Sequence, residues 1–314
     1  MSNREIVAQD LVKVYQRDIR AVDDISFRVR SGEIFGFLGP NGAGKSTAVR
    51  ILTSLGLPTS GSASVGGYDV VEDAARVREI TGVTLQDIGI DPLMRADELL
   101  ILQGRLFGMG LTAARFRSQE LIELVGLQDA VDRRVGTYSG GMKRRLDLAM
   151  SLVHKPEVLF LDEPTTGLDP ASRRDVWQEV RRLNQELDMT IFLTTQYLEE
   201  ADELAERIAI IDHGKIKVTG RPAKLKEALG KESLNLVFED PGLARQVARL
   251  LDPEVERIKL DRDTVLVYQK GIAERIPEIL NQLRAEDVSP LSLTLTQPSL
   301  DDVFLHYTGQ SIQG

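Results

Sequence analysis

Residues 39 to 47 read GPNGAGKST and fit the pattern GxxxxGK[ST]. Glycines at this spacing let backbone N–H groups approach phosphate oxygens, and the amino end of a following helix adds partial positive charge. Lys45 is expected to reach the β- and γ-phosphates of a nucleotide, and Ser46 to hold Mg²⁺. A glycine turn on a core strand is the alternative, which the strand–loop–helix context disfavours. The expected phosphate-binding residues are Gly39, Pro40, Asn41, Gly42, Ala43, Gly44, Lys45, Ser46 and Thr47.

Two adjacent acids, Asp162 and Glu163, follow the apolar run from Val158 to Leu161. A desolvated carboxylate at the end of a buried strand is costly without a cation, and Mg²⁺ supplies one. We expect Asp162 on the metal side and Glu163, one residue further, to polarise the attacking water. Exposed turn acids are the alternative, but the phosphate loop in the same chain favours a catalytic pair.

The elements that position these residues are predicted to be strands of a parallel sheet. Apolar runs cover residues 34–38, 158–161 and 191–193, and polar or glycine-rich residues follow each run. Such strands are typically buried on both faces and present ligand-binding loops at their carboxyl ends. We expect a helix over 47–55 after the phosphate loop. The alternating residues 21–30 predict an antiparallel strand in a side sheet.

The rest of the chain predicts a helical insertion and a second domain. Residues 96–153 carry apolar residues at helical spacing, which indicates an inserted helical subdomain. After about Gly220 the order βαββαβ predicts a ferredoxin-like α+β module. We therefore assign 1–220 to an α/β nucleotide-binding domain and 221–314 to an accessory domain. Strands are expected at 234–238, 257–260, 264–268 and 291–296, and helices at 243–251, 272–283 and 301–307.

Composition excludes several classes of protein. The chain has 314 residues, no cysteine and a net charge of −9. Disulfides and thiolate zinc sites are therefore excluded, and broad electrostatic binding to nucleic acid is disfavoured. Neither a secretion signal nor a run long enough to span a membrane is present in the sequence. The basic run Lys143–Arg145 and the acidic run Glu199–Glu206 are interpreted as solvated helix faces.

The segment Tyr138-Ser139-Gly140-Gly141-Met142 stands between the two chemical motifs and leads into a helical stretch. With these motifs in this order, the sequence resembles the ABC ATPase family, whose signature is usually written LSGGQ. A serine and two glycines at a helix start form an anion site. The resemblance implies a P-loop ABC ATPase fold with a RecA-like core, an antiparallel β subdomain and the inserted helical subdomain.

Three further positions resemble family motifs. Tyr15 resembles the aromatic residue that stacks on adenine, and Asp169 lies in a Gly-Leu-Asp loop that resembles the one aligning two subunits. Gln86 resembles the glutamine that contacts Mg²⁺ or water and reports to the transmembrane partner. The resemblance implies ATP and Mg²⁺ as cofactors. It also implies a head-to-tail homodimer, in which each ATP lies between the phosphate loop of one subunit and Ser139 of the other.

Gln196 departs from the family pattern, because most relatives carry a γ-phosphate-sensing histidine there. Glutamine can donate a hydrogen bond but cannot become cationic. One consequence would be slower or differently tuned hydrolysis. The other is little change in hydrolysis, if Glu163 is the base and Gln196 has only an orienting role, and we favour this second interpretation. The glutamine, the YSGGM signature and the ending QPSLDDVFLHYTG together resemble the daunorubicin-resistance type of drug-exporter ATPase.

This resemblance implies the ATP-hydrolysing subunit of an exporter that drives efflux of a drug-like or hydrophobic compound through a separate membrane permease. The expected location is the cytoplasmic face of the membrane, and no nucleic-acid partner is expected. A soluble ABC ATPase that acts on nucleic acid or ribosomes is the alternative, but the coiled-coil insertion, zinc site or second cassette of such relatives is absent. A non-catalytic regulatory binder is suggested by Gln196 and Met142, and Glu163 weighs against it.

Overall fold

The computed structural model describes residues 4–86, 89–229, 233–251, 255, 257–269, 271–296 and 298–309. These residues divide into two compact units, one ending at Gly220 and one beginning at Arg221. Within the described residues, the structure contains no helix with the length and apolar character needed to cross a membrane.

A six-stranded sheet forms the centre of the first unit, with the strand order β10-β9-β3-β8-β7-β6. All neighbours are parallel except β9 and β10, which are antiparallel. Buried residues occupy every position of β3, β7 and β8, which explains their continuously apolar sequences and confirms the three predicted parallel strands. The strands are β3 (Ile34–Leu38), β6 (Thr81–Thr84), β7 (Val158–Asp162), β8 (Thr190–Thr195), β9 (Arg207–Asp212) and β10 (Lys215–Gly220).

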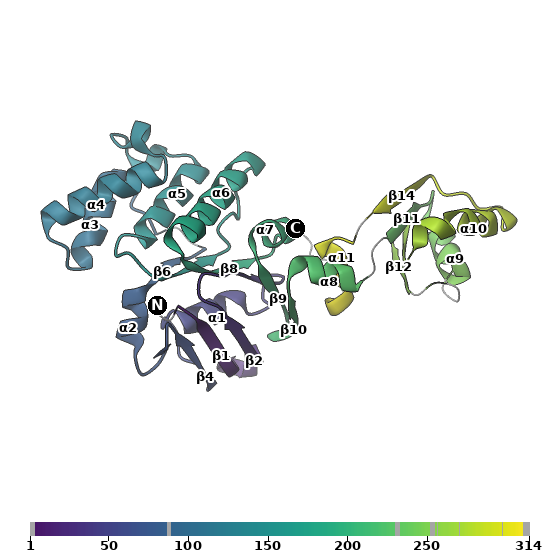
Figure 1. The fold of residues 1–314 in the computed structure, drawn as a ribbon, viewed down its shortest axis with the longest axis horizontal. Helices are drawn as coiled ribbons and strands as arrows, with labels where there is room; N and C mark the ends of the chain where they lie inside the picture. The colour runs from purple at the N-terminus through teal and green to yellow at the C-terminus, as the bar shows by residue number, and fades with distance from the viewer. Residues whose placement is uncertain are drawn as a thin grey trace. The chain divides into compact units, whose positions relative to one another are not determined.

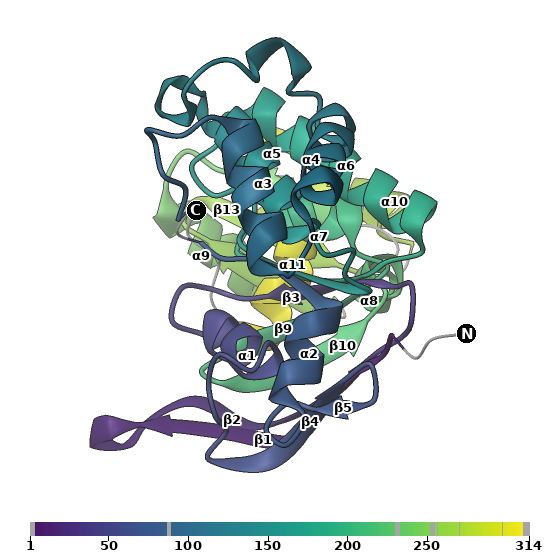
Figure 2. The same ribbon diagram turned by 90° about the vertical axis from the view of Figure 1, so that its left-hand side faces the viewer.

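A second, antiparallel sheet with the order β2-β1-β4-β5 confirms the expected side sheet, with β2 at its edge. Helix α1 (Lys45–Leu52) lies between this sheet and the central sheet (Figure 2). Phe27 of β2 joins the two layers, since its ring centroid lies 5.6 to 5.9 Å from those of Phe35, Phe37 and Phe192. The strands are β1 (Ile6–Tyr15), β2 (Ile19–Val29), β4 (Ser60–Val65) and β5 (Tyr68–Asp69).

The helix after the phosphate loop differs from the prediction of 47–55, because α1 begins at Lys45 and ends at Leu52. It begins earlier because Gly44 adopts a left-handed conformation (φ 107°) and serves as the N-cap. It ends earlier because Ser54 also has a positive φ of 58°, which an α-helix does not accommodate. Lys45 and Ser46 therefore belong to the first helical turn.

Helices cover the other face of the central sheet, and Figure 1 shows α3, α4 and α5 gathered into one group beside it. This group falls within the residues predicted to form the helical insertion. The helices of the unit beyond α1 are α2 (Ala74–Ile80), α3 (Ala96–Leu106), α4 (Leu111–Leu124), α5 (Gly140–Ser151), α6 (Pro170–Leu187) and α7 (Leu198–Leu204), with 3₁₀ turns at Gln16–Asp18, Gln128–Ala130 and Val135–Thr137.

The second unit contains an antiparallel sheet with the order β12-β13-β11-β14. Helices α9 and α10 pack on the apolar face of this sheet, around Leu234, Leu236 and Val267. The element order confirms the predicted ferredoxin-like βαββαβ arrangement. The elements are α8 (Pro222–Ala228), β11 (Ser233–Val237), α9 (Pro241–Leu251), β12 (Arg257–Asp261), β13 (Thr264–Tyr268), α10 (Ile272–Ala285), β14 (Ser292–Thr296) and α11 (Leu300–Thr308).

Candidate functional site

The carboxyl ends of four neighbouring strands bring the predicted chemical residues to one edge of the central sheet. Strand β3 leads into Gly39, β6 leads toward Gln86, β7 ends at Asp162, and β8 leads into Gln196. A backbone hydrogen bond joins the ends of β3 and β8, since the Gly39 N–H donates to the Thr195 carbonyl at 3.2 Å. A cavity of about 400 Å³ opens at this edge and is lined by Ala21, Asn41, Gly42, Gly44, Lys45, Ser46, Thr47, Gln86 and Glu163.

The backbone of the phosphate loop depends on Gly44. Its φ of 107° lies in a region that side chains rarely adopt, and a Cβ built there would lie 2.1 Å from the Ala21 carbonyl oxygen. Only glycine therefore fits between the loop and β2. The turn directs the chain into α1, whose first amide N–H groups have no intrahelical acceptors. An anion above Lys45, Ser46 and Thr47 would meet these donors and the positive end of the helix dipole.

Lys45 is nearly buried, with 4% of its surface exposed. Its ammonium donates to the carbonyls of Gly39 at 2.8 Å and Pro40 at 3.1 Å. It also forms an ion pair with Glu163, with 3.0 Å between Nζ and Oε1. The cation Lys45 thus contacts the anion Glu163 within the cavity lining. A bound phosphate would compete with Glu163 for Lys45.

The two carboxylates at the end of β7 face different surroundings. The Asp162 carboxylate accepts a hydrogen bond from the Thr194 hydroxyl on β8. The Glu163 carboxylate lines the cavity and accepts a hydrogen bond from the Thr166 hydroxyl at 3.2 Å. The amide nitrogen of Gln86 lies 3.5 Å from Glu163 Oε2. Glu163 therefore has a cation on one oxygen and neutral donors on the other.

Ser139 and its glycines lie away from the phosphate cavity. Ser139 is the N-cap of α5, and its hydroxyl accepts the Met142 N–H at 3.2 Å. It does not belong to the described residues that line the cavity. Gly140 and Ser139 are exposed, and Gly141 contacts α6, where a Cβ would lie 2.9 Å from the Ser172 hydroxyl. The signature segment therefore exposes the amino end of α5 at the surface of this chain.

Asp169 begins α6 beside the signature segment. Its carboxylate accepts hydrogen bonds from the backbone N–H groups of Ala171 and Ser172, both at 3.0 Å, and from the Ser172 hydroxyl at 2.6 Å. The hydrogen bond from the Ser172 side chain is the main cause that lowers the pKa of Asp169. Because Gly141 also contacts Ser172, this serine connects the signature segment to the loop that carries Asp169.

Tyr15 and Gln196 are not among the described residues that line the cavity. Tyr15 ends β1 and is 43% exposed, with the Lys13 ammonium 5.1 Å from its ring centroid. Gln196 is half-buried and directly follows Thr195, whose carbonyl holds Gly39. The structure therefore brings Gln86, Glu163 and the phosphate loop together, but it does not bring Tyr15 or Gln196 into the cavity lining.

Two buried charges were missed by the sequence predictions, which assigned both runs to solvated helix faces. Arg144 is 4% exposed and Glu200 is fully buried. Helical spacing could have predicted their burial. Arg144 lies four residues before Leu148 and Glu200 four residues before Leu204, on the buried faces of α5 and α7. Glu200 accepts hydrogen bonds from the Thr165 hydroxyl and the Trp177 indole at 2.8 and 2.9 Å, and burial raises its pKa.

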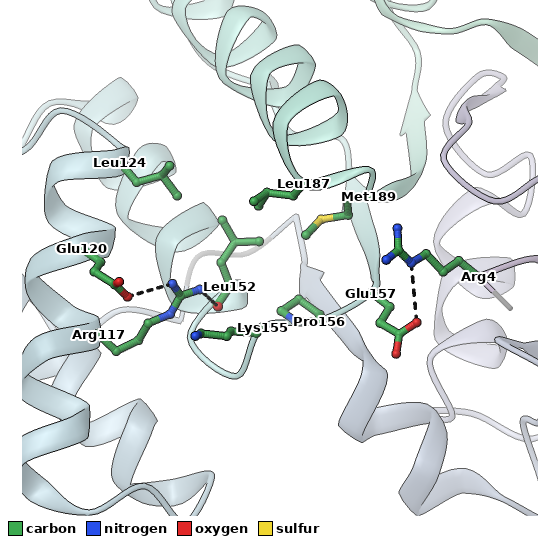
Figure 3. A pocket seen from close by; sticks show the side chains of 10 residues that line it. All are labelled: Arg4, Arg117, Glu120, Leu124, Leu152, Lys155, Pro156, Glu157, Leu187 and Met189. Carbon is green, nitrogen blue, oxygen red and sulfur yellow. Dashed lines mark hydrogen bonds and ion pairs between the residues drawn. The ribbon is translucent and has the colours of Figure 1, made fainter. Parts of the chain in front are cut away.

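A larger cavity of about 510 Å³ lies at the opposite, amino ends of the strands (Figure 3). Glu157 immediately precedes β7 and Met189 immediately precedes β8 on its wall. Four of its charged groups form ion pairs, Arg117 with Glu120 at 3.2 Å and Arg4 with Glu157 at 3.6 Å. Since ligands of open parallel sheets bind at carboxyl strand ends, this cavity is not the phosphate site.

The fold and the smaller cavity define a P-loop nucleotide-binding protein, and comparisons with known proteins specify the class. The family model described as "ABC transporter" matches residues 22–166, and the one described as "ATP-binding protein DrrA1-3-like, C-terminal domain" matches 220–308. The chain is 45% identical over 309 residues to the daunorubicin/doxorubicin resistance ATP-binding protein DrrA of Streptomyces peucetius, covering 98% of this chain and 93% of that protein.

Two further comparisons agree with this assignment. The linearmycin resistance ATP-binding protein LnrL of Bacillus subtilis is 35% identical, over 98% of this chain and 99% of that protein. The dimeric, ADP- and Pi-bound ATP-binding cassette MJ0796 superposes with a TM-score of 0.63 at 24% identity, covering 69% of this chain and 98% of that chain, and supports the fold. The chain belongs to the ABC transporter family of ATP-binding proteins, and it is an ATPase.

Proposed function

We propose that this chain is the ATP-hydrolysing subunit of an exporter and drives efflux of a drug-like or hydrophobic compound through a separate membrane permease. The observation that carries the proposal is the full-length similarity to the resistance protein DrrA, which includes the C-terminal domain as well as the cassette. The similarity to LnrL supports the same role. The chain would act at the cytoplasmic face of the membrane.

In this proposal the phosphate cavity holds ATP with Mg²⁺. Lys45 and the first turn of α1 bind the phosphates, and Tyr15 stacks on adenine. The hydroxyl of Ser46, the amide oxygen of Gln86 and the carboxylate of Asp162 are hard oxygen donors of the kind Mg²⁺ prefers. The metal would neutralise charge that develops on the phosphates. Glu163, already on the cavity wall, would accept a proton from the attacking water, and Gln196 would orient the γ-phosphate.

The working state in this proposal is a homodimer. Ser139 and Lys45 serve one ATP in the family but lie apart within this chain, because Ser139 caps an exposed helix end. A second copy packed head to tail would supply Ser139, Gly140 and Gly141 to the nucleotide on Lys45. Asp169, which shares Ser172 with the signature segment, would align the two copies. ATP would then join the subunits, and its hydrolysis would release them.

The test combines a trapped variant with purification from native membranes. Glu163→Gln should bind ATP, hydrolyse it at least about 10²-fold more slowly and accumulate as an ATP-dependent dimer in size-exclusion chromatography. The trapped protein should also purify with a hydrophobic membrane subunit. Unchanged turnover would remove the assignment of Glu163 as the base. Purification with ribosomes or nucleic acid and without a membrane subunit would replace the exporter with the nucleic-acid alternative.

A further inference from the structure

Arg144 makes an unusual set of contacts for a buried cation. Its guanidinium donates from Nε to the Pro164 carbonyl at 2.7 Å and from Nη2 to the Asp162 carbonyl at 3.2 Å. Its Nη1 donates to the Leu85 carbonyl at 2.9 Å and to the Asp147 carboxylate at 3.1 Å. A single side chain of α5 thus contacts the backbone of two loops at the phosphate cavity.

The carbonyls of Asp162 and Pro164 flank Glu163. Glu163 has a φ of 50°, in the left-handed region, where a residue with a side chain is strained. Such a conformation persists only when surrounding contacts hold it. Thr194 holds it from the β8 side, since its carbonyl and hydroxyl both accept the Glu163 N–H at 3.1 Å. Arg144 holds it from the α5 side, through one carbonyl before Glu163 and one after.

The third carbonyl belongs to Leu85, which directly precedes Gln86. The Gln86 amide lies 3.5 Å from the Glu163 carboxylate. Arg144 therefore fixes the backbone next to each of these two cavity residues. A guanidinium suits this task because its planar fork can donate to several acceptors at once, whereas a lysine ammonium is a single point on a flexible stem.

The burial of this guanidinium is energetically costly and lowers the pKa of Arg144. A charged group is kept in such a place only when its hydrogen bonds are satisfied. Here neutral carbonyls and one carboxylate satisfy it, and the side chain does not line the cavity. Its contacts therefore suit the placement of other groups and not contact with the nucleotide.

We propose that Arg144 is a positioning residue for ATP hydrolysis, which holds the backbone around Glu163 and before Gln86 in the geometry that attack by water requires. The proposal rests on the proposed function, since it takes Glu163 as the base. Binding of the nucleotide depends mainly on the phosphate loop, which Arg144 does not contact. Loss of the guanidinium should therefore lower kcat and leave binding nearly unchanged.

The test is Arg144→Lys in the full-length chain, with Arg145→Lys as the matched control. Arg145 is the next residue of α5 and donates to the carbonyls of Val125 and Gly126, away from the cavity. Because a misplacement of about 1 Å can cost 10²-fold, Arg144→Lys should lower kcat for ATP by roughly 10- to 100-fold. KM and the affinity for the nucleotide should stay within about threefold of the original values. Arg145→Lys should keep the original kcat.

Asp147→Asn gives a second variant that keeps the guanidinium but weakens its anchor, and it should lower kcat by a smaller factor. A lower melting temperature with unchanged kcat in either Arg144→Lys or Asp147→Asn would make the role purely structural and overturn the proposal. So would an equal loss of kcat in Arg145→Lys. If Arg144→Lys keeps its kcat while Glu163→Gln is inactive, only the role of Arg144 fails. If Glu163→Gln remains active, the proposed base fails and the positioning role fails with it.

Discussion

The ion pair between Lys45 and Glu163 predicts that Glu163→Gln increases the affinity for ADP, separately from any effect on hydrolysis. The two side chains are 3% and 4% exposed, and their charged atoms lie 3.0 Å apart. Lys45 must give up this contact to reach a phosphate. The glutamine variant removes the negative charge but keeps the shape of the side chain, so Lys45 would be released from its competitor before the nucleotide arrives.

The size of the effect follows from the distance. At 3.0 Å and an effective dielectric constant of about 20, the attraction between the charges is on the order of 5 kcal/mol. Only part of it is lost, because the carbonyls of Gly39 and Pro40 still accept from Lys45 and the glutamine oxygen can accept one hydrogen bond. We expect a net gain of about 1–2 kcal/mol, which is roughly a 5- to 30-fold tighter binding of ADP.

The assay is a fluorescence titration of each variant with a labelled ADP in the presence of Mg²⁺. ADP avoids hydrolysis and the trapping of an ATP-bound dimer, so the titration reports the binding step alone. Glu199→Gln is the control, because it removes the same charge from an exposed residue of α7 that is not among the described residues lining the cavity. Equal or weaker binding of ADP by Glu163→Gln would refute the reasoning, because the ion pair would then not restrain Lys45.

Two further predictions concern the loop and a buried acid. Gly44→Ala should weaken nucleotide binding by at least about tenfold in the same titration, because its Cβ would lie 2.1 Å from the Ala21 carbonyl; normal affinity would show that the loop can shift. Burial raises the pKa of Asp147 from 3.8 to about 6. Above pH 6 the charged carboxylate therefore lowers the free energy of unfolding, and this loss is relieved as the pH falls toward 3.8 and the folded protein takes up a proton. Relative to Asp147→Asn, the original chain should gain about 1 kcal/mol in the free energy of unfolding between pH 7 and pH 5 in denaturant titrations, and parallel pH curves would contradict the raised pKa.

The sequence predicted those parts of the site that depend on local pattern. The apolar runs of β3, β7 and β8 identify parallel strands, whose shared carboxyl edge brings Lys45 close to Glu163. The start of α1 was placed two residues too late, because the left-handed conformation of Gly44 that begins the helix depends on its fit against Ala21. The positive φ of Glu163 likewise depends on contacts with other elements and leaves no pattern in the sequence.

The buried charges show the same limit more clearly. Charged residues are usually exposed, so the runs that contain Arg144 and Glu200 were assigned to solvated faces. Their burial depends on partners that are distant in sequence, such as Trp177 for Glu200 and the Pro164 carbonyl for Arg144. The only sequence signal for their burial is the helical spacing, which places both residues on the buried faces of α5 and α7. To predict their burial, this spacing must be given more weight than the usual exposure of charged residues.

The turn that carries Glu163 is held from three sides. The Thr194 hydroxyl of β8 accepts a hydrogen bond from the Glu163 N–H, and Arg144 of α5 donates hydrogen bonds to the carbonyls of Asp162 and Pro164. Glu200 of α7 accepts from the Thr165 hydroxyl, two residues further along the same turn. Of these three elements, α5 is the one whose N-cap is Ser139. Arg144 therefore connects the helix that Ser139 caps to the backbone on both sides of Glu163, through protein groups alone.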